Sequence, residues 1–360
     1  MTDALTTGTR ADLRDLVAPT DRAAARELVQ MRENVRRLGI ADLSLKYVDE
    51  HVGHDTSTGP RLAAGSWVAD VRARWRIKGY DDAASGMEVT MTFRETRDAT
   101  VFATARSDYG SRAPLWFLDD LAVQHSRDAL TMVAGDEVGK IGDLADQAVV
   151  DVRKVLPSWR GRLVAEVPDS EHDLNRVLGS TDGSFGAIAA VTTPVDGSVK
   201  DGAPVHIFVN PQVFGRLGQQ GAQIVMSHEA AHVATQAANA TLPAWLIEGF
   251  ADYVALAHAD LPVEVTASQI IEQVSLDGVP HQLPGPAEFE SENTALGASY
   301  EAAWLACKLI SDVSGEARLI RFYKTADRDS GTRTAFADVL GTTEEEFTAD
   351  WRDYLASLAD

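Results

Sequence analysis

Residues 224–234 read IVMSHEAAHVA and residues 241–254 read TLPAWLIEGFADYV. We expect a helix over each segment, because a Thr-x-Pro start signal separates them. The first helix continues for about seven residues past His232, and the second runs for about six residues before it reaches Glu248. At about 1.5 Å per residue, the length of helix after His232 nearly equals the length of helix before Glu248. The sequence therefore predicts a helical hairpin in which Glu248 returns to the level of His232.

Three side chains of this hairpin predict a metal site. Residues four apart lie on one face of a helix, about one turn apart. His228 and His232 can therefore share one Zn²⁺ at about 2.0–2.1 Å each. Glu248 would complete a His₂Glu ligand set and leave a fourth position for water, which is the arrangement of catalytic zinc sites. We expect one Zn²⁺ per chain.

Two more carboxylates flank the predicted ligands. Glu229 follows His228 at about 100° around the helix, which suits a group beside the open metal position better than a ligand. There it can accept a proton from a metal-bound water. Asp252 lies four residues after Glu248, on the same face, where it can accept the free ring N–H of a ligand histidine. By themselves these residues also fit surface histidines and a solvated acidic face, but their combined spacing favours the site.

The two motifs resemble the gluzincin zinc metallopeptidases, the thermolysin-like clan. The resemblance rests on His228-Glu229-x-x-His232 and on WLIEGFAD at residues 245–252, and it extends to the minimal peptidase MA-like domains of actinobacterial envelope proteins. It covers roughly residues 136–360. The gap between His232 and Glu248 is shorter than in thermolysin, which indicates a compact connection. The resemblance implies zinc-dependent hydrolysis of peptide bonds, with a peptide or protein as the substrate.

The same resemblance bears on the mode of cleavage. Aminopeptidases of this clan carry a Gly-Ala-Met-Glu-Asn edge strand whose glutamate binds the free amine of the substrate. The similar segment here, residues 186–190, reads GAIAA and has no acid, which favours an endopeptidase. The backbone of Gly186–Val191 could pair with an extended peptide, although an ordinary core strand fits the segment equally well.

Tyr300 is the candidate for stabilising the oxyanion. The family places a tyrosine on a helix after the third ligand, and Tyr300 opens the helical pattern YEAAWL. A phenol can donate a hydrogen bond while it stays neutral at pH 7. A packing role for Tyr300 stays open, and His258 and His281 are rival donors.

A second class of function also stays open. The chain could be a catalytically silent, zinc-containing binding or interaction protein of the cell envelope, with a partner bound by its N-terminal domain. The enzyme is favoured because Glu229 and all three ligands are present, whereas a lost enzyme usually lacks one of them.

The rest of the chain predicts an α+β fold in two domains. From about Thr9 to Gly39 the apolar residues recur at helical spacing, with Pro19 as a break. Five segments then alternate apolar and polar residues, which is typical of a curved antiparallel sheet with one packed face. These segments are 43–48, 67–75, 88–93, 101–105 and 128–133. We place a boundary near residue 136, so that residues 1–135 form an N-terminal α+β domain with an accessory or binding role.

Residues 136–360 predict a gluzincin domain with a small sheet and a mainly helical lobe. A helix over 141–156 ends at Pro157, and strands follow at 163–167, 186–191 and 205–209. Nearly everything from Leu217 onward is helical, apart from the Pro- and Gly-rich stretch Asp277–Pro286. Strands followed by a run of helices are typical of an α+β arrangement.

Composition limits the partners. The net charge of −21 disfavours nucleic acid and anionic membrane surfaces, both of which it would repel. A solvated acidic surface explains this charge, and a preference for basic substrates is the alternative. No run of 18 apolar residues occurs, so we expect no membrane insertion. The single cysteine, Cys307, fits a small buried core residue.

Location and assembly are less determined. The first residues have neither a basic n-region nor an apolar h-region. The resemblance to envelope proteins favours an extracytoplasmic location with the targeting segment removed, and a cytoplasmic location is the alternative. The sequence leaves the oligomeric state open.

Overall fold

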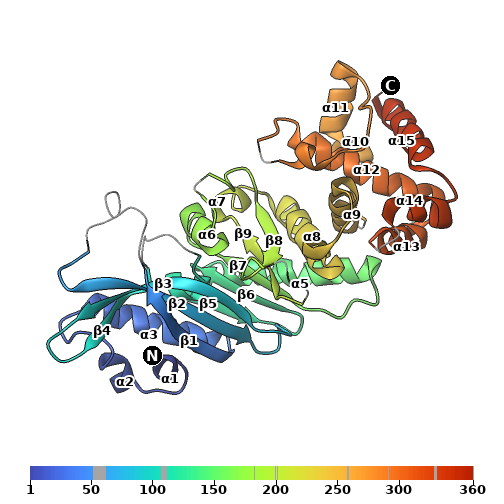
Figure 1. Ribbon diagram of the computed structural model, residues 1–360. Helices are drawn as coiled ribbons and strands as arrows, with labels where there is room; N and C mark the ends of the chain where they lie inside the picture. The colour runs from blue at the N-terminus through green and yellow to red at the C-terminus, as the bar shows by residue number, and fades with distance from the viewer. Residues whose placement is uncertain are drawn as a thin grey trace. The chain divides into compact units, whose positions relative to one another are not determined.

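Figure 1 shows the computed structural model, which describes residues 1–51, 62–106, 112–181, 183–198, 200, 202–257, 259–290, 292–327 and 331–359. The chain forms two compact units, and each is described by itself. Unit 1 comprises Met1–Asp143 and Arg162–Arg216, and unit 2 comprises Leu144–Gly161 and Leu217–Asp360. The predicted α+β class is confirmed, because two sheets are followed by a helical region.

Unit 1 begins with three helices and an antiparallel sheet. The predicted helical region with a break at Pro19 is confirmed by the two helices on either side of it, α2 and α3. Alternation along the chain also predicted the four strands of the antiparallel sheet, whose order is β1-β2-β3-β4. The elements are α1 Thr2–Thr6, α2 Arg10–Arg14, α3 Arg22–Arg37, β1 Ile40–Glu50, β2 Ser66–Ile77, β3 Ser85–Glu95 and β4 Thr100–Thr104.

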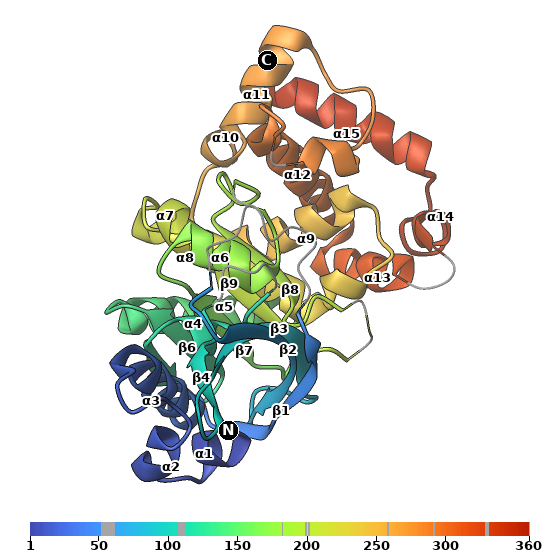
Figure 2. The ribbon, with the colours of Figure 1, turned by 60° about the vertical axis from the view of Figure 1, so that its left-hand side comes forward.

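The helices pack on one face of this sheet (Figures 1 and 2). Leu28 and Met31 of α3 are fully buried in the same apolar cluster as Val71 and Trp75 of β2. Asp21 caps the start of α3 by accepting a hydrogen bond from the Ala24 N–H at 3.0 Å. The period of the apolar residues in each element thus decides which face is buried.

A second, mixed sheet completes unit 1. Its order is β5-β6-β7-β9-β8, with parallel pairing of β6 with β7 and of β7 with β9. β5 and β6 form an antiparallel hairpin, and β8 is an antiparallel edge strand. The elements are α4 Leu115–Leu118, β5 Leu121–His125, β6 Ala129–Ala134, α5 Val138–Val155, β7 Leu163–Val167, α6 Glu171–Leu178, β8 Ala190–Pro194, β9 Val205–Val209 and α7 Pro211–Phe214.

Two strand predictions differ from this sheet. The strand expected at 128–133 in the first sheet is β6 and belongs to the second, where it pairs with β5 and β7. The strand expected at 186–191 starts only at Ala190. Residues 183–187 form turns instead, in which Gly183 has a φ of +87° and the Gly186 N–H donates to its carbonyl oxygen at 3.3 Å.

The division into units also differs from the boundary expected near residue 136. β6 precedes that position and β7 follows it, yet the two strands are hydrogen-bonded neighbours. Residues 162–216 therefore stay with the N-terminal unit. α5 starts in unit 1 and continues into unit 2.

A buried charged cluster joins the two sheets of unit 1. His206 of β9 lies with Nδ1 2.6 Å from Glu166 of β7 and with Nε2 3.0 Å from Asp81, which follows β2. Burial lowers the pKa of His206, but the Asp81 and Glu166 carboxylates outweigh it and raise that pKa to about 9. The imidazolium form therefore stabilises this junction.

Unit 2 is the predicted helical lobe, together with the end of α5. Its core includes aromatic contacts of Trp245 with Phe322 and Phe347, at 6.3 and 6.0 Å between ring centroids. The predicted irregular stretch Asp277–Pro286 lies between α11 and η2. The elements are α8 Gln219–Thr235, η1 Ala237–Asn239, α9 Ala244–Leu256, α10 Val263–Thr266, α11 Ser268–Asp277, η2 Pro286–Phe289, α12 Leu296–Ser314, α13 Glu316–Ala326, α14 Gly331–Ala335, η3 Phe336–Leu340 and α15 Glu344–Ala359.

Small residues let α9 and α12 approach closely. A Cβ added at Gly249 would lie 2.2 Å from the Ala303 carbonyl oxygen, so only glycine fits there without a shift of the helices. Cys307 of α12 is fully buried at this contact, which confirms the expected core position. Within the described ranges, no helix combines the length and the apolar character needed to cross a membrane.

Candidate metal centre

A tight connection brings α8 and α9 together as a hairpin. α8 ends at Gln236, which adopts the left-handed conformation with φ of 55° and donates its N–H to the His232 carbonyl oxygen. The short helix η1 follows, and Pro243 then caps the N-terminus of α9. Proline lacks a backbone N–H, but at the start of a helix this N–H would have no partner within the helix, so none is lost. This connection places Glu248 opposite the histidines of α8.

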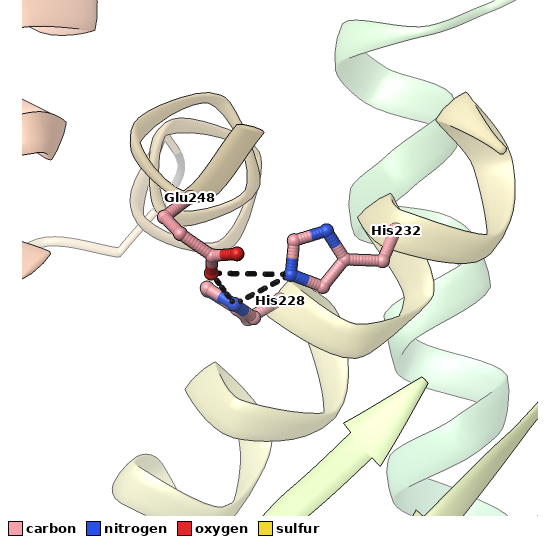
Figure 3. A group of neighbouring side chains, drawn as sticks. All are labelled: His228, His232 and Glu248. Carbon is pink, nitrogen blue, oxygen red and sulfur yellow. Dashed lines mark hydrogen bonds and ion pairs between the residues drawn. The ribbon is translucent and has the colours of Figure 1, made fainter. Parts of the chain in front are cut away.

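The three predicted ligands meet in one place. The Nε2 atoms of His228 and His232 are 2.9 Å apart. Oε2 of Glu248 lies 3.3 Å from the first and 3.4 Å from the second. Figure 3 shows the carboxylate reaching from its own helix toward both imidazoles. These residues form a group that could hold a metal ion.

The triangle of donor atoms fits a tetrahedral ion. With ligands at about 2.0–2.1 Å, the donor atoms of a tetrahedral site are about 3.3–3.4 Å apart. Two of the three separations have this length and the third is shorter, at 2.9 Å. The group is largely shielded, because the exposed side-chain fractions are 12% for His228, 11% for His232 and 21% for Glu248.

The charge of each residue in this group affects the pKa values of the others. Burial would raise the pKa of Glu248, but His232 and His228 outweigh it and lower that pKa far below its usual range. Burial would lower the pKa of His228, but Asp252 and Glu248 outweigh it and raise that pKa. The two imidazoles thus hold the carboxylate in the anionic form that a cation requires.

Asp252 orients His228 from the far side of its ring. Its Oδ1 lies 2.7 Å from Nδ1 of His228, which leaves Nε2 directed at Glu248 and His232. A carboxylate that holds the outer nitrogen of a ligand imidazole fixes the tautomer and the ring orientation. One turn of α9 therefore supplies both Glu248 and the residue that positions its partner.

Glu229 is buried beside the group without belonging to it. Its exposed fraction is 6%, and it lies on α8 directly after His228. It is not a member of the potential ligand set. A buried carboxylate next to a metal group, but outside it, is suited to proton transfer.

Tyr300 also lies at this group. Its ring centroid is 5.9 Å from that of His228, in an edge-on arrangement, and 5.1 Å from that of Phe289. Burial, followed by the charges of Glu248 and Asp252, raises the pKa of Tyr300 above its usual range. Tyr300 therefore keeps its hydroxyl proton at neutral pH and can donate a hydrogen bond.

The two rival donors are placed differently. His281 is exposed in the segment between α11 and η2, and no contact with the ligand group is found for it among the described residues. His258 lies outside the residues that the structure describes.

Sequence reasoning missed two features that support the site. Ser227 is buried directly before His228, and its hydroxyl donates to Asp151 Oδ2 of α5 at 3.0 Å. Gln223, one turn earlier on α8, donates to the Ser227 hydroxyl at 3.1 Å. Gly249 is the second feature. A glycine within a helical pattern was the one available signal of a close helix contact.

No protein-family model matches this chain, and a search of curated proteins finds no match.

Proposed function

We propose that this protein is a zinc-dependent peptidase that cleaves peptide bonds within a polypeptide chain. One observation carries the proposal: two imidazoles and a carboxylate converge to 2.9–3.4 Å, with the buried Glu229 beside them and outside the ligand group. A purely structural metal site would have no use for such an acid. Structural zinc sites are also usually closed by four protein ligands, whereas catalytic sites have three.

Zinc is the proposed metal, with one ion per chain. Imidazole nitrogen and carboxylate oxygen together suit Zn²⁺, and two of the three donor separations match a tetrahedral ion. His228, His232 and Glu248 would hold it. Asp252 contributes by keeping the His228 ring in the tautomer whose Nε2 is free to bind.

When bound, Zn²⁺ supplies Lewis-acid chemistry, since it polarises a carbonyl and lowers the pKa of water. Glu229 accepts the proton of the attacking water and delivers it to the amine that leaves. Its position supports this role, because Glu229 is buried directly after His228 on α8 and lies outside the ligand group.

Tyr300 is proposed to donate a hydrogen bond to the oxyanion. Its position against the His228 ring supports this role, and its raised pKa keeps the hydroxyl proton in place at neutral pH. The segment 186–190, GAIAA, which resembles the amine-binding strand of the aminopeptidases, has no acidic residue that could bind a free amine, and this supports an endopeptidase over an aminopeptidase.

The experiment is cleavage of an unbiased peptide library by the purified full chain. We expect internal cleavage that is abolished by a zinc chelator and restored by added Zn²⁺. The matched control is Glu229→Gln, which removes the proton acceptor and no ligand. Cleavage that survives the chelator, or that the Gln variant performs equally well, contradicts the proposal.

A further inference from the structure

A groove between α2 and α3 carries four exposed arginines. Arg10 and Arg14 lie on α2, and Arg22 and Arg26 lie on α3. The two helices lie side by side in both views (Figures 1 and 2). The volume of the groove is about 520 Å³, which falls within the range of about 300–1,000 Å³ typical of ligand pockets.

These arginines lack the partners that an acidic chain could provide. Acidic residues outnumber basic ones by 54 to 33. Elsewhere on α3, Arg36 pairs with Glu33 at 3.5 Å and Arg37 with Asp120 at 2.6 Å. Across the parts of the chain that are described, none of the four groove arginines forms an ion pair. Each helix therefore carries two arginines four residues apart whose charges are not neutralised, and their mutual repulsion destabilises the helix.

Carboxylates close to these arginines in the sequence do not pair with them, and three of those carboxylates have other partners. Asp12 caps the first turn of α2, and Asp21 caps α3 and pairs with Arg94 at 3.7 Å. Glu27 accepts a hydrogen bond from the Ala105 N–H at 2.6 Å. The groove is thus left with positive charge that a partner could neutralise.

The floor of the groove is apolar. It contains Leu13, which is 2% exposed, together with Ala25 and Val29, and Val29 is 37% exposed. A site built only for a polyanion has no need for such a floor. Nucleic acid and anionic membranes are also repelled over longer distances by the net charge of −21.

We propose that this groove docks an acidic, amphipathic segment of a partner protein. Apolar side chains of the partner enter between Leu13 and Val29, and its carboxylates pair with the guanidinium groups, whose planar shape matches a carboxylate. Arginines four residues apart are about 6 Å apart along a helix axis, which matches carboxylates one turn apart on a partner helix. The proposal does not depend on the metal centre, which lies in the other unit.

The test uses a fluorescein-labelled helical peptide with leucines on one face and glutamates at i,i+4 spacing along both edges of that face. A matched peptide has glutamine in place of each glutamate. Fluorescence anisotropy with the full chain at low salt should give a Kd at least tenfold lower for the glutamate peptide. The difference should shrink as salt is added, because exposed ion pairs are screened. Equal binding of the two peptides overturns the proposal.

The variant Arg22→Glu/Arg26→Glu should weaken binding at least tenfold. The matched control is Arg72→Glu/Arg74→Glu, which makes the same change of charge on the exposed positions of β2 and should bind as the wild type does. If the double variant fails to fold by circular dichroism, Val29→Asp replaces it at a partly exposed position. Equal loss in the control refutes a specific site. Capture by anionic lipid vesicles without binding of the peptide refutes a protein partner.

Discussion

Replacing Gly249 by alanine tests how closely α9 and α12 must pack at the metal centre. A Cβ there would lie 2.2 Å from the carbonyl oxygen of Ala303, 2.5 Å from its carbon and 3.2 Å from Cys307 Sγ. Non-bonded atoms normally stay about 3.5–4.0 Å apart, so the helices must separate by about 1 Å, since backbone atoms cannot rotate away. Such overpacking costs about 1–3 kcal/mol or more, whereas the better helix propensity of alanine returns about 0.5–1 kcal/mol.

We therefore expect Gly249→Ala to lower the free energy of unfolding by roughly 1–2 kcal/mol in urea titrations. Because Gly249 follows Glu248, the shift should also move this carboxylate and weaken zinc binding at least tenfold in a chelator competition assay, since binding sites tolerate only about 0.5 Å.

The matched control is Gly221→Ala on α8. A Cβ at Gly221 would meet Leu217 at an ordinary 3.7 Å, so alanine should stabilise the helix there. If Gly249→Ala is as stable as Gly221→Ala and binds zinc as tightly as the wild type, the close-packing account is refuted.

Three further predictions concern single groups. Asp252→Ala should weaken zinc affinity about 10–100-fold while the protein still folds, because the His228 ring loses its anchor; unchanged affinity would make Asp252 an ordinary surface acid. Tyr300→Phe should lower kcat roughly 10²–10³-fold with little change in KM, zinc content or Tm; a loss of Tm with kcat intact would mark it as a packing residue. The pKa of His206 is about 9 in the folded chain and about 6.5 when unfolded, so its stabilisation is complete below pH 6.5 and is lost as pH rises through 9. Urea unfolding of the wild type should show a loss of at most about 3 kcal/mol across that window, relative to His206→Gln; parallel pH profiles for the two proteins would contradict this.

The site was more predictable than the sheets, for a physical reason. A helix has a fixed rise, so the distance from His232 to Glu248 could be worked out from residue spacing, and the structure brings the two within 3.4 Å.

Strand pairing is not encoded locally in the same way. The alternation at 128–133 identified a strand, but nothing in it specified β5 and β7 as neighbours. The segment GAIAA at 186–190 is an apolar run without alternation, so its pattern fits a strand and a turn equally well. In the structure the chain turns here, beginning at Gly183, which has a positive φ.

Zinc content of the purified chain tests the central claim most directly. Metal analysis after preparation without chelators should give one zinc per wild-type chain and one per Glu229→Gln chain, and His232→Ala should lose most of it. The account is contradicted if the wild type holds no zinc, or if His232→Ala retains as much as the wild type.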